Sequence, residues 1–149
     1  ELAVIKMKRQ IIITFFSVQL LLVSCRVSPE PINYGSDVCH YCSMTIVDNQ
    51  HAAEYVTKKG RAYKFDSIEC MMNDLKELDM AEIGLYLVND YGAPGDLIDA
   101  TLANYLISKN IPSPMGEFLS AFGNLENAKF VQSEQGGQLF SWEALKERF

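Results

Sequence analysis

The segment Ala52–Met72, AAEYVTKKGRAYKFDSIECMM, contains a complete strand–turn–strand–helix pattern and decides which kind of fold the chain can adopt. Residues 52–57 and 62–65 carry aromatic and β-branched side chains, which favour strands. The intervening residues 58–61 include Gly60, and glycine supplies the positive φ that a hairpin turn needs. The segment therefore predicts an antiparallel hairpin that leads directly into a helix.

That helix has a clear start and one apolar side. Asp66 is a good N-cap, and Glu69 three residues later completes a pattern like a capping box. The predicted helix covers residues 66–79. Its apolar positions recur at helical spacing, at Ile68, Met71, Met72 and Leu75. The methionines on this side are therefore expected to pack in the core.

The rest of the chain alternates short strand patterns with two further helices. Strands are expected at 85–88, 99–108, 116–122 and 138–140, and helices after caps at Asn124 and Ser141. The loop Ala93–Gly95 suggests a division into two subdomains. Together, these strands and helices predict an α+β fold with small, mostly antiparallel sheets and about three helices.

The N-terminal residues have the pattern of a bacterial export signal. A Lys–Arg pair follows Met7, and the apolar run IIITFFSVQLLLV is shorter than the ~20 residues that a membrane-spanning helix needs. The run ends in LVSC, which resembles the lipobox of bacterial lipoproteins, whose cysteine is acylated. An incidental cysteine in a plain signal or an anchor helix is the alternative. We expect a true start at Met7, a signal peptide over 1–24, lipidation at Cys25, a tether over 25–36 and a domain over 37–149.

The charge of the chain after this signal excludes one large class of partners. From Cys25 onward there are ten Lys and Arg against eighteen Asp and Glu. Nucleic-acid binding requires a basic face and is therefore excluded. The acidic balance suits a soluble domain held near a membrane, with some attraction for cations. Three cysteines remain after Cys25, an odd number in an exported chain, so at least one thiol stays free or binds something.

The motif DVCHYCSMTI, residues 37–46, places a C-x-x-C two residues before Met44. Attachment of haem would need His directly after the second cysteine, but Ser43 stands there. A structural zinc site lacks a second C-x-x-C, and a redox dithiol lacks the usual strand before it and helix after it. These two readings and a simple Cys39–Cys42 disulfide stay open as alternatives.

The nearby methionine favours a copper site. Thiolate and thioether sulfurs are soft ligands, which select Cu(I), whereas zinc gains little from a thioether. Met115 lies in the segment SPMG and offers a second thioether from a Pro/Gly loop, although Met also fills irregular gaps in cores.

Six segments together resemble the NosL family of copper-chaperone lipoproteins for nitrous oxide reductase, an enzyme of denitrification. The segments are DVCHYCSMTI, HAAEYV, YKFDSIECMM, SPMGEFLSAF, ENAKF and GGQLFSWEAL. The family pattern at the first motif resembles C-x-x-C-G-M, so Ser43 here replaces glycine. The resemblance implies a fold similar to that of organomercurial lyase, without its carbon–mercury cleavage.

The resemblance also implies a function and a ligand set. The chain would be a Cu(I)-binding lipoprotein, not an enzyme, facing the periplasm from the outer membrane. It would pass copper to the machinery that builds the copper–sulfur centre of nitrous oxide reductase. Cys42, Met44 and Met115 would bind the metal, with Cys39 as an auxiliary ligand or a thiol that oxidises with Cys42. Secondary candidates are Cys70, which is otherwise a small buried side chain, His40 and His51. The alternatives are a thiol–disulfide oxidoreductase that maintains a copper site and a structural metal-binding lipoprotein.

Overall fold

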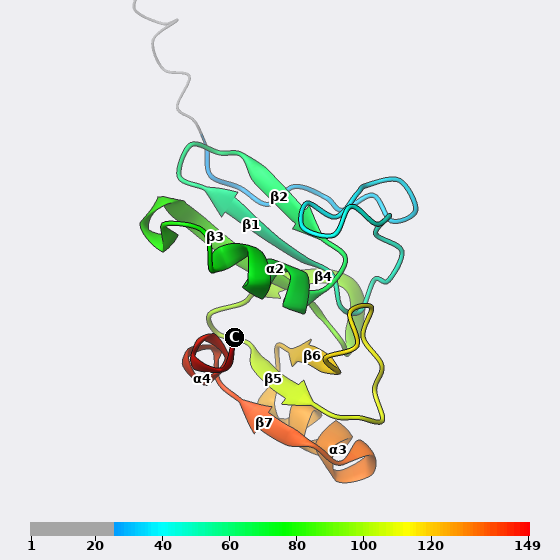
Figure 1. Ribbon diagram of the computed structural model, residues 1–149. Coiled ribbons are helices and arrows are strands. Elements are labelled where there is room, and N and C mark those ends of the chain that lie inside the picture. The colour runs from blue at the N-terminus through cyan, green and yellow to red at the C-terminus, as the bar shows by residue number, and fades with distance from the viewer. Residues whose placement is uncertain (1–25) are drawn as a thin grey trace, which may run out of the picture.

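The computed structural model describes residues 26–149, so the expected signal peptide and Cys25 lie outside the described residues. Within that range the chain forms two antiparallel sheets (Figure 1). The four-stranded sheet has the order β2-β1-β3-β4, with β1 Ala53–Thr57, β2 Ala62–Phe65, β3 Ile83–Asp90 and β4 Ala93–Asp99. The three-stranded sheet has the order β6-β5-β7, with β5 Asn104–Ile107, β6 Leu119–Phe122 and β7 Gln138–Phe140.

Three α-helices and one short 3₁₀ helix accompany these sheets in residues 26–149. They are α2 Ile68–Leu75, η2 Met80–Glu82, α3 Leu125–Gln135 and α4 Trp142–Arg148. Helix α2 contacts β1, β2 and β6, and therefore packs between the two sheets, whereas α3 and α4 contact the three-stranded sheet (Figure 1). The predicted α+β class with small antiparallel sheets and three helices is confirmed. In this part of the chain, each helix is too short or too polar to cross a membrane.

The predicted hairpin forms, but the helix after it starts and ends differently from the prediction. Ala53 pairs with Phe65 across β1 and β2, and Gly60 has a φ of 83° in the turn. The N-cap of α2 is Ser67, whose Oγ accepts a hydrogen bond from the backbone N–H of Cys70 at 3.1 Å. The predicted Asp66 cap is wrong because Ser67 fills that role one residue later. The helix also ends at Leu75, since the following residues turn toward η2.

The second half of the chain differs from the prediction at two loops. Residues Ala93–Gly95 begin β4 and do not divide two subdomains. Pro94 is tolerated there because β4 is an edge strand, where a missing N–H removes no inner ladder bond. Residues 100–103 and 116–118 are not strand, so β5 and β6 are shorter than predicted. The caps at Asn124 and Ser141 are confirmed.

One main hydrophobic core joins the two sheets. It contains buried residues from both of them and from the helices, among them Tyr55, Phe65, Ile68, Met71, Met72, Val88, Tyr105, Leu119 and Leu145. A smaller cluster of Leu106, Ile111, Phe122 and Ala128 lies beside α3. The burial of Met71 and Met72 confirms that they are core residues.

The extended segment before the C-x-x-C motif is attached to the four-stranded sheet. The backbone N–H of Glu30 donates to Glu54 Oε1 at 2.9 Å, and Lys64 Nζ donates to the carbonyl of Pro31 at 2.7 Å. Further along, the Tyr34 hydroxyl donates to Asn89 Oδ1 at 3.0 Å. These contacts determine where the motif loop enters the fold.

Candidate metal site

Residues 37–46 form a narrow loop that separates an inward cysteine from an outward methionine. Its two arms are joined by a bridge between Val38 and Thr45 and by the N–H of Cys39, which donates to the Met44 carbonyl at 2.8 Å. The Cys39 side chain is only 1% exposed, whereas Met44 is 61% exposed. The loop therefore places one sulfur inside the protein and one at its surface.

Ser43 at the tip of this loop has a φ of 63°. In this left-handed region a side chain crowds the backbone, which costs about 1 kcal/mol for a residue other than glycine. Ser43 is also the position at which the family motif resembles C-G-M. The serine therefore keeps a glycine-like backbone conformation at some cost in stability.

Three cysteines and one aspartate meet beneath the loop. The ligand atoms of Cys39, Cys42, Asp66 and Cys70 all lie within 4.8 Å of one another. We call these four residues the thiol cluster. The motif loop supplies the first two, and the junction between β2 and α2 supplies the others. All three cysteines are free thiols, so the simple Cys39–Cys42 disulfide is absent from this structure.

The cluster is buried on all sides except at Cys42. Cys70 and Cys39 are almost completely inaccessible, Asp66 is 4% exposed, and Cys42 is partly exposed. Its sulfur is therefore the one that solvent or a partner reaches first.

The protons of the thiol cluster are unevenly shared. The neighbouring Cys70 thiol is the main reason that the pKa of Cys39 falls to about 6. The neighbouring Cys39, followed by burial, holds the pKa of Cys70 far above its ordinary value. Burial, followed by the neighbouring Cys39, raises the pKa of Cys42. The cluster therefore favours a thiolate at Cys39 and a proton on Cys70.

Asp66 contributes an oxygen that has no hydrogen-bond partner in the described part of the chain. This buried atom, Oδ1, is costly to leave unpaired, because it has lost its water without replacement. A metal ion held by the neighbouring sulfurs would satisfy it. The full set of three sulfurs and one carboxylate suits zinc, whereas the three sulfurs by themselves suit Cu(I).

The structure brings together only part of the predicted ligand set. The sulfurs of Cys39, Cys42 and Cys70 lie together, so Cys70, which the sequence predicted only as a secondary candidate, belongs to the cluster itself. Met44 follows Cys42 at the surface, and Met115 lies at 39% exposure in a loop tied to α2. Sequence reasoning missed Asp66 because it was assigned as the helix cap. The available signal was Ser67 beside it, an equally good cap that leaves Asp66 free.

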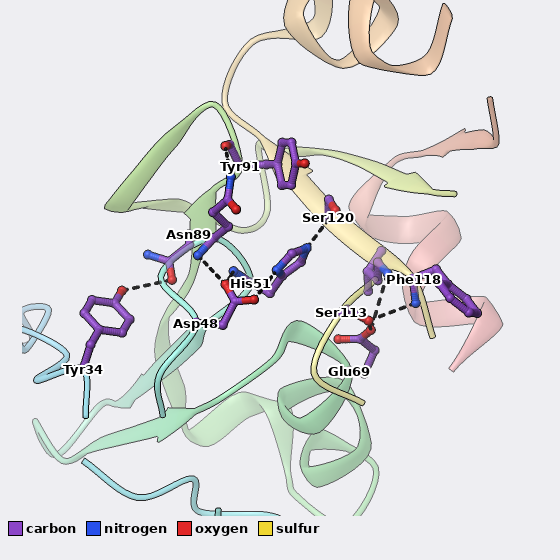
Figure 2. A network of polar contacts seen from close by, with 11 residues as sticks. Tyr34, Asp48, His51, Glu69, Asn89, Tyr91, Ser113, Phe118 and Ser120 are labelled. Atoms are coloured by element: carbon purple, nitrogen blue, oxygen red, sulfur yellow. Dashed lines mark hydrogen bonds and ion pairs between the residues drawn. The ribbon is translucent and has the colours of Figure 1, made fainter. Parts of the chain in front are cut away.

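Neither histidine is part of the thiol cluster. His51 is buried, with Nδ1 3.0 Å from Asp48 Oδ2 and Nε2 3.1 Å from Ser120 Oγ (Figure 2). This order of contacts is that of a hydrolase triad. However, Ser120 is completely buried, so a substrate has no access to its hydroxyl. The His51 contacts are therefore a structural connection between the loop before β1 and β6. The exposed His40 ring packs on Tyr63, with 4.6 Å between ring centroids.

Three comparisons with known proteins find relatives of this chain. A family model described as NosL matches residues 32–149. The copper-binding lipoprotein NosL of Stutzerimonas stutzeri is 29% identical over 130 residues, which covers 80% of this chain and 68% of that protein. The crystal structure of the copper chaperone NosL from Shewanella denitrificans has the same fold, with a TM-score of 0.69 and 21% identity. That match covers 79% of this chain and 95% of the other.

Proposed function

The chain belongs to the NosL family, and on that basis we propose that it is a lipid-anchored Cu(I) chaperone and not an enzyme. In this proposal the protein faces the periplasm from the outer membrane. It delivers copper to the maturation machinery that assembles the copper–sulfur centre of nitrous oxide reductase.

The observation that carries the proposal is the thiol cluster beneath an exposed methionine. Cys42 is both a member of the cluster and the neighbour of Met44 along the chain. A bound metal would displace the proton of Cys42, and the resulting thiolate is the anchor ligand that connects the buried sulfurs to the surface thioethers. Soft sulfur ligands of both kinds favour Cu(I) over harder cations.

The exposure of the two methionines supports a transfer role. Met44 and Met115 are neutral, weak ligands on exposed loops, so an incoming acceptor can displace them before it displaces a charged thiolate. Copper would then leave by stepwise ligand exchange, with Cys42 as the last ligand to be released.

The oxidoreductase alternative is less consistent with the thiols. A redox nucleophile is an accessible thiolate with a lowered pKa. Here the lowered pKa belongs to the buried Cys39, whereas the accessible Cys42 has a raised pKa. The thiol that a disulfide substrate could reach is therefore the wrong one for that chemistry.

A competition titration tests the proposal. The reduced full chain, in detergent micelles and without oxygen, would be titrated with Cu(I) against a coloured Cu(I) chelator, with Zn(II) as the competing metal. We expect about one Cu(I) per chain in the thioether site and binding at least ~10-fold weaker in the Met44→Leu/Met115→Leu variant. Leucine keeps the volume of methionine and removes its sulfur.

Met80 provides the matched control. It is 38% exposed, close to the value of Met115, but lies outside both loops. Met80→Leu should leave the affinity for Cu(I) unchanged. Equal binding by the parent chain and the double variant, or displacement of Cu(I) by zinc, would refute the chaperone proposal.

A further inference from the structure

A buried carboxylate on α2 is bonded to the loop that carries Met115. Glu69 is completely buried, and its Oε1 accepts a hydrogen bond from the Ser113 hydroxyl (Figure 2). The same oxygen accepts the backbone N–H of Leu119, the first residue of β6, at 3.4 Å. One carboxylate oxygen therefore joins the helix to both sides of the loop.

The Ser113 hydroxyl also closes this loop from within. It accepts the backbone N–H of Phe118 at 2.9 Å, and the Ser113 carbonyl accepts the N–H of Gly116 at 3.0 Å. Phe118 has a φ of 62°, a conformation that a bulky side chain rarely adopts and that neighbouring contacts must maintain. Each of these two hydrogen bonds closes a stretch of chain that contains Met115. The position of its backbone therefore depends on Ser113, and the position of Ser113 depends on Glu69.

Packing alone does not explain a carboxylate at this place. The second oxygen of Glu69, Oε2, is buried and has no hydrogen-bond partner in residues 26–149. An apolar side chain of similar size would avoid this cost, as it often does where a buried charge is replaced. Both side-chain hydrogen bonds recorded for Glu69 reach the segment 113–119 and neither reaches its own helix. The contacts of this carboxylate therefore serve the loop.

Glu69 is also the immediate neighbour of Cys70 on α2. Successive side chains of a helix point about 100° apart. A single turn of α2 therefore directs Cys70 to the thiol cluster and Glu69 to the methionine loop. We propose that Glu69, acting through Ser113, is a positioning residue that holds the Met115 thioether in place for the copper bound at the cluster. This inference rests on the proposed function, in which Met115 is a copper ligand.

The test measures how much Met115 contributes to binding when Glu69 is changed. Cu(I) affinity of the reduced full chain in micelles would be measured with and without Met115→Leu in four backgrounds: the parent chain, Glu69→Leu, Glu69→Gln and Ser120→Ala. Glutamine retains an oxygen that accepts from Ser113, whereas leucine does not. Ser120→Ala removes a buried hydroxyl of the same strand region whose recorded contact is with His51. Such cycles isolate the coupling between two residues.

We expect Met115→Leu to weaken Cu(I) binding at least ~10-fold in the parent, Glu69→Gln and Ser120→Ala chains, but less than ~3-fold in Glu69→Leu. A second measurement needs no metal: the methyl group of Met115, labelled with ¹³C, should become more mobile by NMR in Glu69→Leu only. If Glu69→Leu fails to fold, Ser113→Ala, which removes the bridging hydroxyl, takes its place with the same expectation.

Two different failures are distinguishable. If Met115→Leu weakens binding equally in the parent and Glu69→Leu chains, and the methyl stays ordered, the positioning role of Glu69 is overturned while the copper site stands. If Met115→Leu has no effect even in the parent chain, Met115 is not a ligand, and both this inference and that part of the proposed function are wrong.

Discussion

The sulfurs of Cys39 and Cys70 lie within 4.8 Å of each other, so a thiol of the motif loop and a thiol of helix α2 are buried side by side. This pairing prepares a charged soft ligand inside the protein before any metal arrives. It also brings the start of α2 against the motif loop. The pair is therefore part of the fold as well as part of the candidate site.

The lowered pKa of Cys39 predicts a dependence of stability on pH. The pKa of Cys39 is lowered to about 6, below the ordinary value of ~8.5, so the unfolded chain binds more protons than the folded chain between these values. The stability that Cys39 contributes should therefore be full above about pH 8.5, decrease as the pH is lowered, and be lost as the pH falls through about 6. Above this pH range, the raised pKa of Cys70 should lower the stability as the pH rises, because the folded chain then keeps a proton that the unfolded chain loses.

Urea unfolding of the metal-free reduced chain checks this expectation. The difference in unfolding free energy between the parent and Cys39→Ser should grow from pH 6 to pH 8.5. The absorbance of the thiolate near 240 nm should show a step near pH 6 that Cys39→Ser lacks. A difference that stays constant with pH would mean that Cys39 is protonated at neutral pH.

Replacing Ser43 by glycine should stabilise the metal-free protein. Glycine adopts the observed φ of 63° without steric cost, which is worth about 1 kcal/mol, less the extra entropy of the unfolded chain. Chemical denaturation should show a higher midpoint with an unchanged slope. Ser43→Ala is the control and should bring no gain, and a stabilised alanine variant would show that the serine hydroxyl, and not the backbone, is responsible.

The substitution Asp66→Asn should weaken metal binding more than it weakens the fold. The buried Oδ1 of Asp66 has no partner in the described residues, so Asp66→Asn should cost less than ~1 kcal/mol of metal-free stability and weaken metal binding at least ~10-fold. Asp74 is the contrasting case, because its Oδ2 accepts the Tyr55 hydroxyl at 2.8 Å outside the cluster. Asp74→Asn should lower stability without changing metal affinity. Equal metal affinity in the parent and Asp66→Asn chains would exclude Asp66 from the site.

Stripping the metal should leave the domain folded. The main core contains residues from both sheets and from the helices, and within residues 26–149 Cys39 and Cys70 are the only members of the thiol cluster among its buried residues. In excess chelator we therefore expect cooperative thermal unfolding and a native far-UV circular dichroism spectrum. Added Cu(I) should then raise Tm, with a stabilisation that grows with the logarithm of the free Cu(I) concentration above Kd. A chain that unfolds in chelator would instead support the structural metal-binding alternative.

Local patterns in the sequence determined the elements whose contacts are close along the chain. The hairpin of β1 and β2 follows from alternating strand residues around Gly60, and the caps at Asn124 and Ser141 follow from side chains that reach the next turn. The soft-ligand motif was also readable, because Cys42 and Met44 are two residues apart. Such features need no knowledge of the rest of the fold.

Tertiary structure alone decided which residues meet across longer separations. The sequence could not choose between Asp66 and Ser67 as the cap, because both side chains can accept the same N–H. Burial beside the motif loop made the choice and left Asp66 with the thiols. Cys70 likewise read as a simple buried side chain until packing placed it against Cys39. The bond from Ser113 to Glu69 has no local signature either, since packing of α2 between the two sheets creates it.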